Sequence, residues 1–153
     1  HRGTIYINWA DQRNGVDNTD IWVTRSTDGG DTWSEPTRVN DDAGKAHQFF
    51  SWMAVDQTTG YLYVVFYDRR NHAEHETDVY LAYSTDGGAS FTNVKISESP
   101  FVPDKSVFFG DYNNISVHGG VIRPIWTRYA GRKLSIWTAL INEKTLLEQR
   151  KTD

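Results

Sequence analysis

The sequence contains no cysteine among its 153 residues. Disulfide scaffolds, thiol catalysis and cysteine-ligated zinc sites are therefore excluded. No apolar run approaches the about 20 residues of a membrane-spanning helix, so we expect no span. Basic residues do not cluster, and 20 acidic against 16 basic side chains give a net charge of −4. Nucleic acid and anionic membranes are therefore not expected as partners.

The composition is that of a folded domain, with 38% hydrophobic and 14% aromatic residues. This content of core-forming residues is too high for a disordered chain. The sequence opens at His1-Arg2-Gly3, without an initiator methionine or a signal-peptide pattern. We expect it to be a piece of a longer protein.

An internal repeat covers nearly the whole chain. Residues 19–33 (TDIWVTRSTDGGDTW) recur 58 positions later as residues 77–91 (TDVYLAYSTDGGASF), with seven of fifteen positions identical. A third, more divergent copy runs from Gly120 to Trp137. Such periodicity is typical of repeat architectures.

Within each repeat, short segments rich in β-branched and aromatic residues are bounded by Gly, Asn and Asp, which predicts strands. Four strands per repeat, designated A to D, are typical of propeller blades. The chain starts at strand B of one repeat and ends after strand C of another. The first predicted strands are 4–10, 20–25, 37–40 and 51–55, and a helix is predicted at 143–151. The predicted blades are about 3–48, 49–107 and 108–142, followed by a tail at 143–153.

Residues 26–33 and 84–91 share the pattern S-x-D-x-G-x-[TS]-[WF] between predicted strands C and D. An aspartate can accept backbone N–H groups across a tight turn, and glycine permits positive φ. The final aromatic ring can pack back against the sheet. The pattern therefore predicts structural turns rather than a reactive site. Its defining residues are Ser26, Asp28, Gly30, Trp33, Ser84, Asp86, Gly88 and Phe91.

This pattern resembles the Asp-box, or BNR repeat, of the sialidase-like β-propeller superfamily. The resemblance implies an all-β propeller of six or more blades, with the Asp-boxes opposite the active site. The chain would then hold about two and a half four-stranded blades, as a C-terminal fragment. The remaining blades of the same propeller are its expected partner, with the missing strand D supplied by an N-terminal segment. The alternative is that identical or proteolysed chains assemble into a ring.

The B–C and D–A connections gather polar and aromatic residues at one end of the predicted blades. Arginine binds carboxylates in a bidentate manner, and aromatic faces suit sugar rings, so this end could hold an acidic sugar. The Asp-x-Arg element occurs in both repeats, however, which favours a structural pairing for it. The candidate substrate-binding residues are Arg13, Arg69, Arg70, Trp52 and His47.

Sialidases of this architecture use three arginines, a Tyr–Glu nucleophile pair and an aspartate acid/base, and a tyrosine nucleophile is unusual among glycosidases. By this resemblance, Tyr112 and the adjacent Asp111 are the catalytic candidates, with Tyr112 and Trp52 opening inner strands. The flanking Gly110-Asp111-Tyr112-Asn113-Asn114 departs from the usual sialidase surroundings. A packed or channel-lining tyrosine is the alternative for Tyr112.

Two segments carry weak metal-binding patterns. Residues 72–76 (HAEHE) could ligate a metal, and Asp104, Asp111 and Asn113 offer oxygens suited to calcium. A flexible charged loop explains the first segment equally well, and the second lacks EF-hand-like spacing. No cofactor is therefore expected, with calcium at the second segment as the alternative.

We therefore expect a secreted, cell-surface or periplasmic bacterial propeller that binds or hydrolyses glycans through the B–C and D–A connections. The fragment alone is expected to be inactive. The alternative is a non-catalytic propeller that acts as a scaffold for protein–protein interaction.

Overall fold

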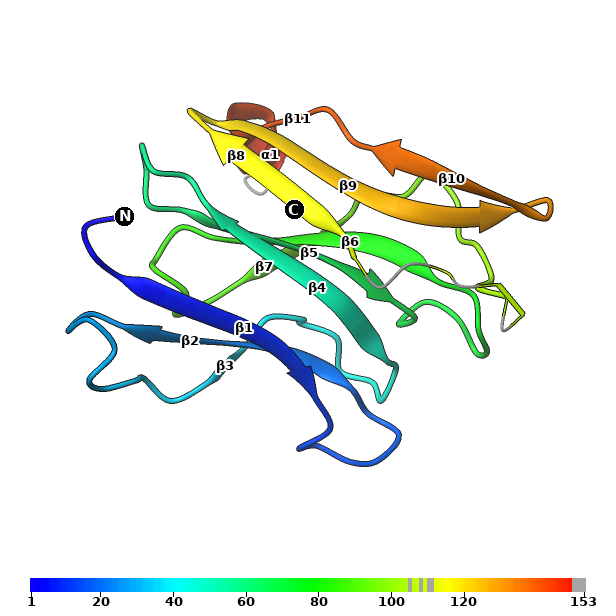
Figure 1. Cartoon of the computed structure of the whole chain (residues 1–153), viewed down its shortest axis with the longest axis horizontal. Helices are drawn as coiled ribbons and strands as arrows, with labels where there is room; N and C mark the ends of the chain where they lie inside the picture. The colour runs from blue at the N-terminus through cyan, green and yellow to red at the C-terminus, as the bar shows by residue number, and fades with distance from the viewer. Residues whose placement is uncertain (105, 108, 110–111, 150–153) are drawn as a thin grey trace.

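The fold is described by a computed structural model that covers residues 1–104, 106–107, 109 and 112–149, without the side chain of residue 149. Over these residues the chain is all-β, as predicted, with antiparallel sheets and one short helix. The strands form three open sheets that stack side by side, with the central sheet between the other two (Figure 1).

The first sheet contains β1 (Ile5–Asp11), β2 (Asp20–Ser26) and β3 (Thr37–Arg38), in that order. β1 and β2 pair along their whole length, from Ile5 opposite Ser26 to Asp11 opposite Asp20. The strands predicted at 4–10 and 20–25 are therefore confirmed to within one residue. The third is shorter than predicted.

The central sheet contains β4 (Gln48–Val55), β5 (Leu62–Asp68), β6 (Asp78–Ser84) and β7 (Thr92–Lys95). The predicted start of β4 at Ser51 was wrong, because a β-bulge between Phe49 and Trp52 interrupts the alternation that marks a strand. Phe50, inside this bulge, has a φ of 51°. Trp52 therefore lies in the middle of β4 rather than at its start.

The third sheet contains β8 (Asn114–His118), β9 (Val121–Ala130), β10 (Lys133–Thr138) and β11 (Ile141–Asn142). β10 and β11 share one register on the edge of β9 that β8 leaves free. Their pairing breaks opposite Pro124, which has no N–H to donate. The hydroxyl of Thr138 donates to the Pro124 carbonyl at 2.7 Å instead.

Two further predictions concern the ends of the third sheet. Tyr112 was expected to open an inner strand, but β8 begins at Asn114 because pairing with β9 starts there. The predicted helix is present as α1 (Glu143–Gln149), and its last two predicted residues lie outside the described part of the chain.

The core consists of the two interfaces between neighbouring sheets. All seven residues of β5 and all seven of β6 are buried, because this sheet is covered on both faces. One face packs Val64, Phe66 and Ala82 against Ile21 and Val23 of the first sheet. The other face packs against the third sheet and α1. The central sheet contributes Tyr63, Val65, Tyr67, Val79 and Leu81 to this second cluster, and the third sheet and α1 contribute Ile115, Ile122, Trp126 and Leu146.

Asp56, in the turn after β4, ties the central sheet to the third. Its carboxylate accepts the N–H of Gly120 at 2.8 Å, and the N–H and hydroxyl of Thr58 at 2.8 and 2.7 Å. Burial alone would raise the pKa of Asp56, but these hydrogen bonds outweigh burial and lower the pKa to about 2. The folded state therefore favours the ionised carboxylate.

We predict that Asp56→Asn destabilises the protein by about 2 kcal/mol at neutral pH, because the folded pKa lies below the ordinary value. The stabilisation is complete above pH 4 and disappears as the pH falls through about 2. The difference in unfolding free energy between wild type and variant, measured in urea, should therefore shrink over this window. Asp17→Asn, at an exposed position, is the control and should change little. A pH-independent difference for Asp56→Asn would contradict this assignment.

Candidate functional site

The connections alternate between the two ends of the sheets. One end, here called the loop face, carries the connections β1–β2, β3–β4, β5–β6, β7–β8 and β9–β10 (Figure 1). The other end, here called the turn face, carries the turns after β2, β4, β6 and β8. Every candidate binding residue except Trp52 belongs to, or directly borders, a connection of the loop face.

An Asp-x-Arg clamp is repeated on the loop face. The backbone N–H of Arg13 donates to Asp11 at 3.1 Å, and that of Arg70 donates to Asp68 at 2.7 Å. Each arginine also lies 4.3 Å above an aromatic ring at the same repeat position, Trp22 for Arg13 and Tyr80 for Arg70. Identical geometry in both repeats favours a structural role for the clamp.

The two clamps differ in burial. The Arg13 side chain is 38% exposed, whereas that of Arg70 is 13% exposed. Arg70 also pairs with Asp41 of the β3–β4 connection and donates to Asn93 of β7 at 2.8 Å. Arg70 thus joins three segments, and these contacts occupy its guanidinium.

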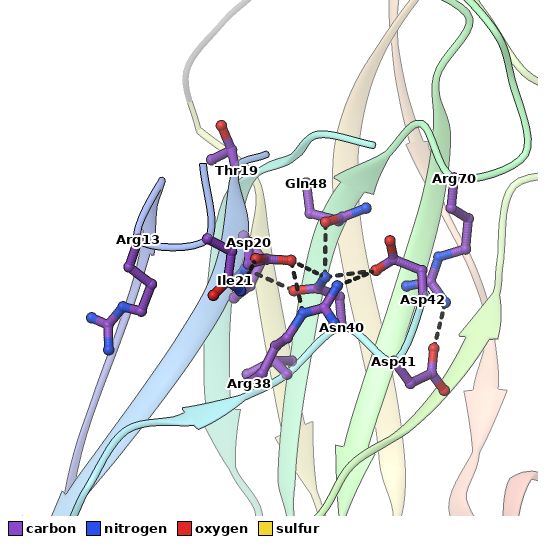
Figure 2. A network of polar contacts seen from close by, with 12 residues as sticks. Arg13, Thr19, Asp20, Ile21, Arg38, Asn40, Asp41, Asp42, Gln48 and Arg70 are labelled. Carbon is purple, nitrogen blue, oxygen red and sulfur yellow. Dashed lines mark hydrogen bonds and ion pairs between the residues drawn. The ribbon is translucent and has the colours of Figure 1, made fainter. Parts of the chain in front are cut away.

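A buried polar network connects the first sheet to the central sheet (Figure 2). The amide nitrogen of Asn40 lies 2.7 Å from Asp20 Oδ1 and 2.8 Å from Gln48 Oε1. Gln48 then donates to Asp68 at 3.2 Å. Asp20, Gln48 and Asp68 are fully buried, so the network fixes the position of the β3–β4 connection.

Arg38 and Asp42 complete this network (Figure 2). Arg38 donates to Asp20 at 2.8 Å and to Asp42 at 3.0 Å. The side-chain nitrogen of Asn40 is also 2.7 Å from Asp42, and the side-chain Oδ1 of Asn40 accepts the backbone N–H of Ile21 at 2.8 Å. Arg38 therefore balances the negative charge of Asp20, and Asn40 fixes the backbone at the start of β2.

The next repeat contains the equivalent arrangement around buried Asp78. Asn71 and His72 lie 3.1 and 3.0 Å from Asp78 Oδ2, and Ser97 donates to Asp78 Oδ1 at 3.1 Å. Ser97 also accepts the N–H of Val79, as Asn40 accepts that of Ile21. Asp20 and Asp78 were not among the predicted site residues, although the repeated Thr-Asp at 19–20 and 77–78 marks them.

An aromatic cluster lies where the central and third sheets meet at the loop face. Tyr67 contacts the rings of Phe49, Phe101 and Phe109 at centroid distances of 5.5, 5.7 and 5.3 Å. The guanidinium of Arg69 lies 5.0 Å above Phe49, and burial lowers the pKa of Arg69. This cluster supports the bulged start of β4.

The bulge exposes aromatic rings along the edge of the central sheet. Phe50 is 37% exposed and Trp52 is 40% exposed. The side chain of buried Asn113 donates to the Phe50 carbonyl at 2.8 Å, which stabilises the unusual backbone of the bulge. Two rings are therefore presented to solvent from the loop face down β4.

The remaining candidates do not converge on one point. His47 Nδ1 lies 3.0 Å from the hydroxyl of Thr19, at the border of the polar network. Tyr112 is 78% exposed, and no hydrogen bond or ion pair between described residues joins it to Arg13, Arg69 or Arg70. Asp111 lies outside the described residues.

A shallow hollow on the loop face is lined by Val102, Pro103, Asp104 and Tyr129. The Tyr129 hydroxyl donates to Asp104 at 3.2 Å. Hydrogen bonds from the hydroxyl and N–H of Ser106 lower the pKa of Asp104, so its carboxylate is ionised at neutral pH. An aromatic ring and a carboxylate therefore border the same hollow, which sequence reasoning did not identify.

The two S-x-D-x-G segments lie on the turn face, away from this site. Ser26 donates to Asp28 and Ser84 donates to Asp86, both at 2.7 Å, and the N–H groups of Gly30 and Gly88 donate back to the serines. Both glycines have positive φ, 103° and 84°. The indole of Trp33 donates to Gly30, and Phe91 packs against the core. These contacts are those of structural turns, and the second turn also accepts a hydrogen bond from Arg25 of the first sheet at 2.6 Å.

The structure shows neither a metal-binding cluster nor a membrane-spanning helix over the described residues. Among the described residues, no three His, Cys, Asp or Glu side chains are arranged to hold a metal ion. His72 is instead placed between Asp78 and Glu76. Over the same residues, no helix has the length and apolar character needed to cross a bilayer.

The chain is similar in structure, but not in sequence, to known proteins. No known family profile matches it, and no curated protein is similar in sequence. One similar structure is the Hadza microbial sialidase Hz136, with a TM-score of 0.55 and 14% identity over 94% of this chain and 43% of the sialidase. Another is Zg3597, a family 117 glycoside hydrolase produced by the marine bacterium Zobellia galactanivorans, with a TM-score of 0.50 and 15% identity over 92% of this chain and 49% of that protein.

These similarities establish the fold. At such identities they show the fold alone: the three sheets are arranged as in the β-propeller-like fold of these two proteins. The chain spans less than half the length of either protein.

We predict that Arg70→Ala destabilises the protein far more than Arg13→Ala, although the two arginines are repeat equivalents. Removing Arg70 leaves the fully buried Asp68 carboxylate without its positively charged partner, and burial already raises the pKa of Asp68. The loss of Arg70 should therefore cost about 3 kcal/mol of unfolding free energy. Removing the more exposed Arg13 should cost much less, because solvent screens its ion pair with Asp11. Urea unfolding of both variants measures the difference. Equal losses would show that Arg70 is not the structural tie described above.

Proposed function

We propose that this protein binds glycans as part of a sialidase-like β-propeller, through the loop face and the adjoining edge of β4. The observation that supports this most directly is the exposure of aromatic rings next to fixed polar groups at this end. Tyr129 borders the hollow with Asp104, and Phe50 and Trp52 continue along β4. The similarity in fold to two glycoside hydrolases agrees with this proposal.

The chemistry of these groups suits a sugar. Pyranose C–H groups pack on aromatic rings such as those of Trp52 and Tyr129, and their hydroxyls donate to carboxylates such as Asp104. Arg69 adds a positive charge beside Phe49, where an acidic sugar would be favoured. Arg13 and Arg70 are instead committed to the clamps, so their proposed part is to hold the loops in place.

We propose that hydrolysis of a glycan requires the complete ring of propeller sheets, of which this chain forms three. Further sheets of the same fold would supply the arginines and the acid/base aspartate that a sialidase-like mechanism needs. Within this chain, Tyr112 with Asp111 remains the proposed nucleophile region, and the two turn-face segments are proposed to be Asp-boxes. On this proposal the protein is a secreted or surface-bound bacterial enzyme, and the three sheets alone bind without turnover.

A second candidate function is a non-catalytic scaffold for protein–protein interaction. The scaffold function is favoured by the ion pairs of the loop face, in which Arg13 pairs with Asp11, and Arg70 pairs with Asp41 and Asp68. These charges stabilise loops and are not left free to bind a substrate.

We predict that Trp52→Ala weakens glycan binding about tenfold, the loss expected when an exposed stacking ring is removed. Sialylated and neutral oligosaccharides on an array would identify a ligand, and calorimetry would then measure its affinity. Trp33→Ala is the matched control, because Trp33 is 41% exposed and Trp52 40% exposed, but Trp33 lies on the turn face.

The same array separates the two functions. No binding to any glycan, or an equal loss for Trp33→Ala and Trp52→Ala, would contradict the proposal and favour the scaffold. For the complete protein, a fluorogenic sialoside assay on Tyr112→Phe tests the nucleophile, and unchanged turnover would exclude Tyr112.

A further inference from the structure

The β5–β6 connection, residues 69–77, contains a histidine ring placed between two carboxylates. Nε2 of His72 lies 3.0 Å from Asp78 Oδ2, and Nδ1 of the same ring lies 3.3 Å from Glu76 Oε2. The His72 side chain is 15% exposed, that of Asp78 is fully buried, and that of Glu76 is 56% exposed. Both ring nitrogens therefore face a carboxylate, one inside the protein and one at its surface.

The number of protons on the ring decides how many of these contacts can be hydrogen bonds. An ionised carboxylate only accepts hydrogen bonds, a protonated imidazole donates from both nitrogens, and a neutral imidazole donates from one. Burial raises the pKa of Asp78, but hydrogen bonds, chiefly from Asn71 and His72, outweigh burial and lower that pKa. A protonated His72 can thus bind both carboxylates, whereas a neutral His72 can bind only one.

The equivalent aspartate of the first repeat has a permanent positive charge beside it. Asp20 and Asp78 occupy the same position, since each pairs with the last residue of the preceding strand. Arg38 and Lys95 are also equivalent, since each pairs with the aromatic residue two positions after its aspartate. Arg38 Nε lies 2.8 Å from Asp20, but Lys95 Nζ lies 3.5 Å from Asp78. The positive charge of this position is therefore held less closely in the second repeat.

His72 stands where the first repeat has no side chain. At the repeat offset of 57 it corresponds to Gly15. The preceding residues are alike, because the amides of Asn14 and Asn71 lie 2.7 and 3.1 Å from the aspartates of their own repeats. The second repeat therefore combines a more distant lysine with a histidine, the side chain whose charge changes near neutral pH.

The other charged or titratable side chains around this point come from β7, β6 and the connection itself. They are Lys95 at Asp78 Oδ1, Tyr80, whose hydroxyl accepts from Asn71 at 2.8 Å, and Arg70, which is paired with Asp41 and Asp68. Among the described residues, Glu76 and Asp78 are the carboxylates in contact with the ring. A change in the charge of the ring therefore acts first on these two contacts.

The contact between His72 and Glu76 closes the exposed tip of the connection. Residues 73–76 are exposed, whereas buried Thr77 exchanges two backbone hydrogen bonds with the β7–β8 connection, at 2.8 and 3.0 Å. A ring with one proton should keep that proton on the side of Asp78, because an unpaired buried carboxylate costs more than an exposed one. Glu76 then faces a nitrogen lone pair and loses its hydrogen bond.

We propose that His72 is a pH switch for the β5–β6 connection. The protonated ring binds Glu76 and Asp78 and orders residues 73–76, and the neutral ring keeps Asp78 and releases Glu76. Arg69, which is proposed to face an acidic sugar, belongs to the same connection. The contacts that carry the inference all lie within the central sheet and its connections, so the inference is independent of glycan binding.

Nuclear magnetic resonance of the chain at about pH 5.5 and about pH 7.5, on either side of the usual histidine titration, tests the switch. The ring nitrogen shifts of His72 should show two N–H groups at the lower pH and one, on Nε2, at the higher pH. The backbone order parameters of residues 73–76 should fall from about 0.85 to below about 0.6. Order parameters that stay constant while the ring loses its proton would overturn the proposal, as would a ring that keeps one protonation state throughout.

Stability measurements separate a switch from a purely structural contact. His72→Gln keeps one donor at every pH, so its unfolding constant in urea should exceed that of the wild type about fivefold at the lower pH and match it at the higher pH. His75→Gln is the matched control, because His75 is exposed in the same connection, and it should match the wild type at both pH values. An equal loss for His72→Gln at both pH values would contradict the proposal.

Glu76→Gln tests which carboxylate is released. An amide can accept from a protonated ring and donate to a neutral one, so the order parameters of residues 73–76 should no longer change with pH. A pH dependence in Glu76→Gln equal to that of the wild type would overturn the proposed release of Glu76. These readouts need no glycan, so failure of the switch and failure of glycan binding are distinguished.

Discussion

Burial of the central sheet on both faces is the constraint on which the rest of the structure depends. Every residue of β5 and β6 is buried, so this sheet cannot be stable without a sheet on either side. The first and third sheets supply that cover. The same packing therefore accounts for the core and for the parallel orientation of the loops.

Polar contacts between the packed sheets fix the positions of the connections on the loop face. Buried Asp20 and Asp78 begin β2 and β6, and each accepts hydrogen bonds from the preceding loop and from a residue in or after the next strand. Gln48, through Asn40, and Arg70, through Asp41, then link the first sheet to the central one. Because each buried carboxylate must be paired, the loops have little freedom, and rings such as Trp52 and Tyr129 are presented from a rigid support.

The sequence predicted the parts of the fold that repeat. Alternating strands and the recurring S-x-D-x-G segment give the all-β class and most strand limits, because both depend on local pattern. The bulge at Phe50 could not be predicted, since it depends on the Asn113 side chain from a distant segment. The partners of Arg70 were equally hidden, because Asp41 and Asn93 approach it only after the sheets stack. The hollow at Tyr129 is likewise a product of tertiary packing.

The central claim, that the central sheet depends on a sheet on each of its faces, is tested most directly by amide hydrogen exchange. The account predicts that the amides of β5 and β6 exchange only through global unfolding, so their exchange free energies should equal the unfolding free energy measured in urea. Amides of β5 or β6 that exchange through local opening, at much lower free energies, would contradict it.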